Sequence, residues 1–257
     1  MLDLFWAELE RKWIEFIRYP VEALGAIFVT TSFFYALFLG AQYMAGPTSQ
    51  FGERQDAVVI GYVLWTLVIF IVNDVGINLQ VEAQTGTLEQ VLLSPYSAPR
   101  IFVARALASL TLRLTLISTI LGVILLLTGS RLSFPPTLVL PLLSVILGAY
   151  GISFLAGSLA LLFKRIQQLL GIMQFGLLFL LAVPAEEWQG GMAVVGQLLP
   201  MVGGAGLLRD LMARGQGLAV LPWLGSLAVG AGYFALGLLA FKWAVDQAKS
   251  KGNLSSY

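Results

Sequence analysis

Long apolar runs separated by short polar segments are the feature of this sequence that most constrains its fold. A helix needs roughly 20 apolar residues to cross about 30 Å of hydrocarbon, and several runs reach that length. Only 11% of the 257 residues are charged, against about one quarter in a soluble domain. Because hydrocarbon offers no hydrogen-bond partners to the backbone, the chain is predicted to be an all-α integral membrane protein.

The apolar runs predict six membrane-spanning helices within a single transmembrane domain, residues 1–257. The predicted spans cover residues 21–44, 57–80, 98–128, 137–163, 166–183 and 218–245. Residues 1–20 form an amphipathic pattern with tryptophans beside basic residues, which favours a helix in the membrane interface. A helix packed on a soluble partner is the alternative.

Lysine and arginine are unevenly distributed over the two sides that six spans would define. One side holds Arg11, Lys12, Arg18, Arg100, Arg105, Lys164, Arg165, Lys242, Lys249 and Lys251; the other holds Arg54, Arg131, Arg209 and Arg214. An excess of basic residues marks the cytoplasmic side. We therefore expect a plasma (inner) membrane protein with both termini and residues 81–97 in the cytoplasm.

The polar segment at residues 81–97 carries its own helix signals. Thr87 and Gln90 have the spacing of a capping box, Gly86 permits a tight turn before them, and Ser94-Pro95 ends the helix. Apolar and polar residues alternate at helical spacing, with Leu88, Val91 and Leu92 on one face and Glu89 and Gln90 on the other. The segment predicts a helix of about two turns on the membrane surface, where another protein can press on it.

Asp74 and Arg113 are the ionisable residues most clearly inside predicted spans. A lone charge in hydrocarbon is costly and normally finds a partner, so these two side chains are predicted to form an ion pair. The pair would either fix helix packing or take part in gating or proton movement. Asn73 and Asn78 are expected to extend the network or to hydrogen-bond across helices.

Residues 184–217 are moderately apolar but interrupted where a spanning helix would be continuous. Glu186, Glu187 and Trp188 form a polar start, and Pro200 and Gly203-Gly204 break the pattern before Arg209. We expect a helix-break-helix that dips into the outer leaflet beside the exit of a pathway, since irregular backbone at that depth needs protein or water around it. An extracellular loop is the alternative. The many glycines of the spans indicate close helix packing or dimerisation.

Several function classes are disfavoured by composition. Cysteine and histidine are absent, which removes thiol and histidine catalysis and the usual zinc sites. Asp74 alone offers no acid–base pair, so no catalytic residue and no metal site are predicted. The net charge of +1 gives no reason to expect nucleic acid. No G-x-x-x-x-G-K-[ST] loop occurs, so any ATP hydrolysis must come from another polypeptide.

The residues of the polar segment resemble a known signature. Glu82, Gly86-Thr87-Leu88-Glu89 and Leu92-Leu93-Ser94-Pro95 resemble the E…GTLE…LLSP motif of type-2 ABC exporter permeases. Leu198-Leu199-Pro200 and Leu207-Leu208-Arg209-Asp210 are similar to that family's segment before the last span. The resemblance implies that the segment of Glu82, Gly86, Thr87, Leu88, Glu89, Val91, Leu92, Ser94 and Pro95 couples the spans to an ATPase.

The same resemblance implies the partners and the cargo. ABC ATPase subunits would bind ATP and Mg, this chain would bind no cofactor, and a second permease (in a homo- or heterodimer) and membrane lipids would complete the assembly. Arg18-Tyr19-Pro20 before the first span is closer to exporters of drugs and small lipophilic compounds than to glycan exporters. Export of an amphiphilic or hydrophobic compound is therefore expected, with a lipid-linked glycan as the alternative. An ion-coupled secondary transporter or channel that uses Asp74 and Arg113 is the further alternative.

Overall fold

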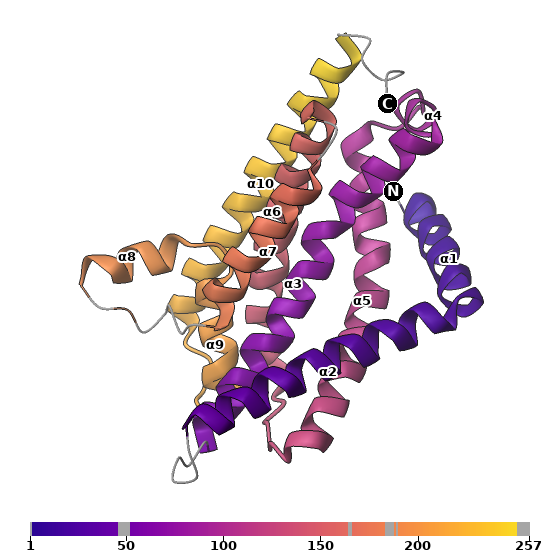
Figure 1. Ribbon diagram of the computed structural model, residues 1–257. Helices are drawn as coiled ribbons and strands as arrows, with labels where there is room; N and C mark the ends of the chain where they lie inside the picture. The colour runs from indigo at the N-terminus through magenta and orange to yellow at the C-terminus, as the bar shows by residue number, and fades with distance from the viewer. Residues whose placement is uncertain (1, 46–51, 164–165, 183–187, 189, 251–257) are drawn as a thin grey trace.

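The computed structural model describes residues 2–45, 52–163, 166–182, 188 and 190–250 and is built of helices throughout these ranges. Its elements are α1 (Leu2–Arg18), α2 (Pro20–Ala45), α3 (Gly52–Thr85), α4 (Leu88–Leu92), α5 (Ala98–Thr128), the short 3₁₀ helix η1 (Pro136–Leu138), α6 (Val139–Phe163), α7 (Gln167–Ala182), α8 (Gly191–Leu198), α9 (Val202–Met212) and α10 (Val220–Ser250). Figure 1 shows α4 at the same end of the molecule as the last turns of α10.

Five of the described helices are long and apolar enough to cross a membrane: α2, α3, α5, α6 with the preceding η1, and α10. The prediction of an all-α, multi-pass membrane protein is confirmed. The fifth predicted span corresponds to α7, which is apolar but has only 16 residues. Helix α3 continues without a break to Thr85, so the first residues of the polar segment at 81–97 form the end of that helix.

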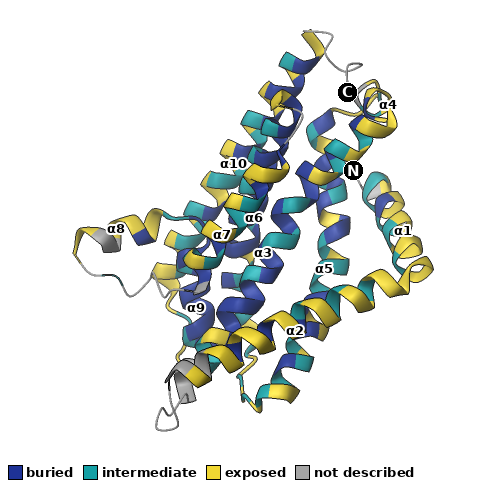
Figure 2. Ribbon diagram, in the orientation of Figure 1, coloured by how far each residue is buried: buried dark blue, intermediate teal, exposed yellow. Residues whose placement is uncertain are grey.

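The centre of the bundle is formed by α3 and α6. Their candidate spans are 72% and 61% buried, whereas those of α2 and α10 are each only 17% buried. Figure 2 shows the same contrast, with dark blue concentrated on α3 and α6 and yellow on α2. Since the exposed faces of α2 and α10 are largely apolar, they suit lipid or another membrane helix better than water.

Glycines allow α6 and α10 to pack with their backbones in contact. A Cβ atom on Gly237 would overlap the Gly151 carbonyl oxygen, and one on Gly151 would overlap the Tyr233 backbone. A Cβ atom on Gly230 would likewise meet the Ser144 carbonyl oxygen. These glycines therefore act in packing within one chain, the first of the two roles expected for them.

Hydroxyl groups connect the central helices through main-chain carbonyl oxygens. The Ser153 hydroxyl of α6 donates to the Ile71 carbonyl oxygen of α3 at 2.7 Å. The Tyr150 hydroxyl donates to the Ala106 carbonyl oxygen of α5 at 2.6 Å. In a bilayer such interhelical hydrogen bonds help to hold packed helices together, so α6 is fixed to both α3 and α5.

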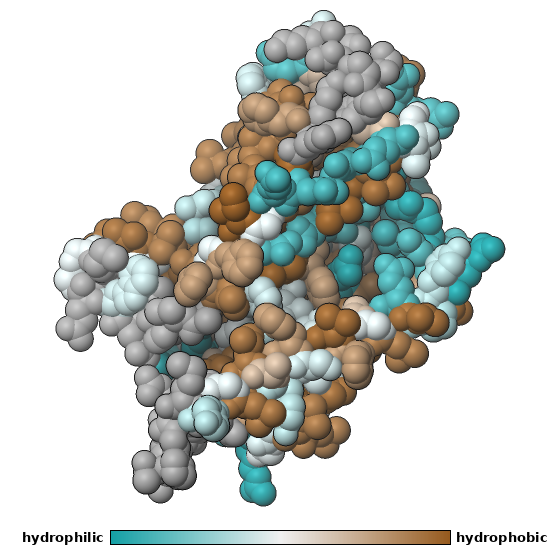
Figure 3. All heavy atoms as spheres, viewed as in Figure 1, coloured by the Kyte–Doolittle hydropathy of each residue, from teal (hydrophilic) through white to brown (hydrophobic). Residues whose placement is uncertain are grey.

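The N-terminal helix α1 lies against α5 and places Glu8 and Phe16 on its inner side. Glu8 is buried against α5, whereas Trp6 and Trp13 are 62% and 48% exposed. At Tyr19 the chain bends sharply into α2, as Figure 1 shows. Figure 3 shows hydrophilic residues gathered near α1 and hydrophobic residues along α2. This arrangement leaves the tryptophan side of α1 free to meet lipid, as an interfacial helix requires.

Residues 190–212 contain the predicted helix-break-helix, but one of the predicted breaks is wrong. The break lies at residues 199–201, where Met201 adopts a left-handed conformation with φ 69°. Gly203 and Gly204 lie inside α9 instead, where Gly204 permits close approach to Val145 and Pro141 of α6. The glycines thus serve packing, because α9 is buried against α6 and α10.

Replacing Gly237 by alanine is expected to destabilise the protein by about 1–3 kcal/mol, because the added methyl group must separate α6 from α10. Gly232 on the same helix is the matched control, since a Cβ atom there meets nothing within 4 Å. Gly232→Ala is expected to be neutral or to stabilise by up to about 1 kcal/mol through helix propensity. Thermal unfolding of the purified protein would measure both; equal midpoints for the two variants would contradict the packing role of Gly237.

Candidate functional site

Helix α3 ends in a backbone motif that fixes the direction of the following segment. Gly86 has φ 73°, and its N–H donates to the Ala83 carbonyl oxygen at 3.3 Å. The N–H of Thr87 donates to the Glu82 carbonyl oxygen at 3.0 Å. This pair of bonds is a Schellman motif, which needs a residue that tolerates the left-handed conformation. The predicted tight turn at Gly86 is confirmed.

The predicted capping box at Thr87 and Gln90 is wrong. Thr87 has a helical backbone and makes no side-chain cap; its hydroxyl instead lies 3.0 Å from that of Thr85 and donates to the Glu82 carbonyl oxygen at 3.4 Å. The hydroxyl is therefore engaged with the end of α3. Helix α4 is only five residues long, shorter than predicted, and ends before Ser94-Pro95.

The two faces of α4 differ as the sequence predicts. Leu88 is 1% exposed and Val91 packs against the core, whereas Glu89 and Gln90 are exposed. The side chain of Leu92 lies outside the described residues. Pro95 is exposed and Ser94 half-buried just beyond the helix.

Two exposed apolar side chains at this end of the molecule were missed from the sequence. Leu93 is 84% exposed and Tyr96 is 48% exposed, next to the exposed face of α4. Leu93 lies five residues after Leu88, which at helical spacing places the two side chains on opposite sides of the helix. The exposure of Leu93 could therefore have been inferred from the sequence. Tyrosine is enriched in protein interfaces, and the exposed Leu93 adds apolar area beside Tyr96.

An arginine bridge links three helices just before α4. Arg105 of α5 donates through Nε to a Glu8 carboxylate oxygen of α1 at 2.7 Å, and through a terminal nitrogen to a Glu82 carboxylate oxygen of α3. The three side chains are only 11–15% exposed. The guanidinium group also lies 5.4 Å from the centre of the Phe102 ring. A shielded arginine shared by two carboxylates ties the N-terminal helix to the end of α3.

The sequence did not reveal this bridge. Glu82 was predicted to be functional because of its place in the motif. Glu8 was considered only as part of the interfacial helix, and Arg105 only as one of the basic residues that mark the cytoplasmic side. The other Glu82 carboxylate oxygen is buried without a hydrogen-bond partner among the described residues. Glu82 therefore depends on Arg105 for its neutralisation, and only the folded structure shows which arginine supplies it.

Asp74 and Arg113 do not form the predicted ion pair. Asp74 is 7% exposed and accepts a hydrogen bond from the Asn78 side chain at 3.1 Å. The Arg113 guanidinium group lies 5.0 Å from the centre of the Phe70 ring. Their charges interact across a longer gap, because Arg113 turns toward the junction of α1 and α2. The predicted interhelical role of Asn73 does appear: the side-chain amide of Gln174 on α7 donates to its oxygen at 3.3 Å.

Of the residues predicted to lie near an exit, Glu186 and Glu187 lie outside the described residues. Trp188 is half-buried and Pro200 is buried in the turn between α8 and α9. Arg209 is 2% exposed and donates to the carbonyl oxygen of Leu181 near the end of α7. Arg209 thus joins α9 to α7. Among the described residues no three acidic side chains come together as a metal site.

Comparison with known proteins identifies the family of this chain. A family model described as "ABC-2 type transporter" matches residues 3–183, from α1 through α7. A comparison with curated protein sequences found no match. The matched region covers most of the chain and contains the Glu8–Arg105–Glu82 bridge and α4. The chain therefore belongs to the ABC-2 type transporter family and is a membrane-spanning permease, a transport subunit without a catalytic role of its own.

Proposed function

We propose that this permease is the membrane subunit of an exporter that moves an amphiphilic or hydrophobic compound outward with energy from a separate ABC ATPase. ATP and Mg would be bound by that ATPase, and a second copy of the permease or a related chain would complete the pathway. The observation that carries the proposal is the surface of α4. One face of α4 packs on the bundle through Leu88, and the opposite face of α4 is exposed.

The exposed side of this segment suits a docking role. Glu89 and Gln90 offer polar groups, and Leu93 and Tyr96 offer apolar area beside them. Apolar side chains at the centre of an interface contribute most of the binding free energy, and polar groups at its rim fix the orientation. We expect the ATPase to bind this surface, which then lies in the cytoplasm together with both termini.

The Arg105 bridge gives a route by which movement of α4 reaches the spans. The rigid turn at Gly86 joins α4 to α3, and Arg105 joins α3 to α5 and α1. A push on α4 would therefore displace three helices together. Because the bridge is shielded from water, the two carboxylates would resist separation from the guanidinium group.

We assign six spans to α2, α3, α5, α6, α7 and α10. Sixteen residues of α7 extend about 24 Å, and a helix shorter than the hydrocarbon can be accommodated by local thinning of the bilayer. We assign α8 and α9 to a segment that enters the outer leaflet and returns. This assignment is supported by the burial of α9 against α6 and α10 and by the turn at Met201.

Docking through α4 predicts that Leu93→Asp weakens association with the ATPase at least tenfold, because a charge would replace an apolar contact at the interface. Glu89→Lys is expected to act in the same direction. Co-purification of the ATPase and ATP-dependent efflux would be measured together. Glu10→Lys is the matched control, since Glu10 is exposed and belongs to α1 rather than to α4. Full association of the Leu93→Asp variant with the ATPase would refute the docking surface.

The bridge predicts that Arg105→Gln destabilises the permease by about 3 kcal/mol, because it leaves two shielded carboxylates without their partner. Arg11 also pairs with Glu8, at 2.8 Å, but is 54% exposed, so Arg11→Gln should cost less than about 1 kcal/mol.

Glu8→Gln removes one carboxylate of the bridge but keeps the Glu82–Arg105 pair. This variant therefore tests transmission of movement through α1 with a smaller effect on the stability of the permease. In the assembled complex this variant should hydrolyse ATP at the normal rate but transport less cargo per ATP. An unchanged ratio of transport to hydrolysis would show that α1 takes no part in coupling.

A further inference from the structure

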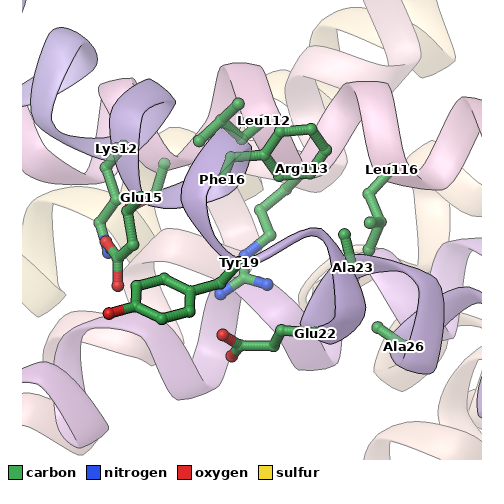
Figure 4. A pocket seen from close by; sticks show the side chains of 11 residues that line it. Lys12, Glu15, Phe16, Tyr19, Glu22, Ala23, Ala26, Leu112, Arg113 and Leu116 are labelled. Carbon is green, nitrogen blue, oxygen red and sulfur yellow. The ribbon is translucent and has the colours of Figure 1, made fainter.

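A polar cavity lies at the bend between α1 and α2, where both meet α5. It has a volume of about 170 Å³ and is lined by Lys12, Glu15, Tyr19, Glu22, Ser109 and Arg113, together with apolar residues. Figure 4 shows the Arg113 guanidinium group reaching past Phe16 toward Tyr19 and Glu22. The cavity is separate from the α4 surface and from the Arg105 bridge.

Basic and acidic side chains both line this cavity, but not all of them form ion pairs. Lys12 pairs with Glu15 at 3.3 Å. Arg113 and Glu22 face the same space, yet among the described residues neither forms an ion pair; the Arg113 guanidinium group lies over the Phe70 ring, and Asp74 interacts with it across a longer gap. A guanidinium group and a carboxylate held across a cavity can be bridged by a ligand that carries both an anionic and a cationic group.

A buried hydroxyl group lines the same cavity. Ser109 is 3% exposed; its hydroxyl lies near the Asp74 carboxylate but makes no hydrogen bond of good geometry among the described residues. A buried polar group without a partner is costly. The hydroxyl can donate to an anionic oxygen bound beside Arg113, which gives the cavity a second donor for a phosphate group.

A second, apolar cavity continues along the same two helices. It has a volume of about 740 Å³ and is lined by α2 and α5, from Leu24 and Ile27 to Leu39 and Leu127. Ala26 lines the polar cavity, so the apolar one begins where the polar one ends. A polar end at the membrane interface followed by an apolar groove has the shape and polarity of a lipid molecule.

We propose that the α2–α5 groove binds one membrane phospholipid with a phosphoethanolamine headgroup. The phosphate accepts hydrogen bonds from Arg113 and Ser109, the ammonium group donates to Glu22, and an acyl chain occupies the apolar cavity. An acidic headgroup fits less well because it would face Glu22 without a cation. A choline headgroup has no N–H to donate to that carboxylate. This proposal requires only that the chain spans a membrane. It does not depend on the direction or the cargo of transport.

Native mass spectrometry of the full-length permease, titrated with phosphatidylethanolamine, phosphatidylcholine or phosphatidylglycerol, tests this proposal. We expect one tightly held phosphatidylethanolamine, bound about tenfold more tightly than the other two lipids, as one charge-assisted hydrogen bond allows. Arg113→Gln should weaken binding of all three lipids. Glu22→Gln should remove the preference while leaving the phosphate contact. Arg100→Gln and Glu10→Gln, at exposed positions outside the cavity, are the matched controls.

Ala26→Phe provides a second test that changes no charge. The phenylalanine ring would fill the end of the apolar groove next to the polar cavity and so exclude the lipid. This variant should lose the bound phosphatidylethanolamine while keeping its helical circular dichroism and its oligomeric state. Three results would overturn the proposal: equal retention of all lipids by wild type and variants, a preference for phosphatidylglycerol that Glu22→Gln strengthens, or an Ala26→Phe variant that changes oligomeric state but keeps its lipid. The last result would mean that a second copy of the chain covers this face.

Discussion

Helices surrounded by hydrocarbon gain little from the hydrophobic effect when they pack on one another, so this bundle depends on close backbone approach. The contact of α6 with α10 through Gly151 and Gly237 provides it. Hydroxyl groups of α6 then fix α3 and α5 by hydrogen bonds to main-chain carbonyl oxygens. The result is a centre of α3 and α6, with α10 packed on α6 and with α1 and α2 at the edge.

The Arg105 bridge connects that centre to the segment that we propose as the docking surface for an ATPase. Arg105 lies on α5 but neutralises carboxylates of α1 and α3, and Glu82 lies at the last turn before Gly86. One side chain therefore couples the surface helix α4 to three longer helices. Shielding from water makes the bridge costly to break, which would suit the transmitting role that we propose for it.

The edge formed by α1 and α2 differs in character from the rest. Many of its apolar residues are exposed, and Lys12, Glu15 and Glu22 line a cavity with Arg113. The proposed phospholipid would complete this edge by supplying the partners that Arg113 and Glu22 lack among the described residues. Lipid would then be part of the surface on which α1 rests, beside the bridge that holds Glu8.

The sequence alone determined the elements whose causes are local. Apolar length fixed the helices, Gly86 fixed the turn after α3, and the spacing of Leu88 and Val91 fixed which face of α4 packs. Tertiary structure alone decided which charges meet. Arg113 turned away from Asp74, and Arg105 reached Glu8 and Glu82 at separations of 97 and 23 residues, because the partner of a long side chain depends on how helices cross, and helix crossing depends on contacts remote in the chain.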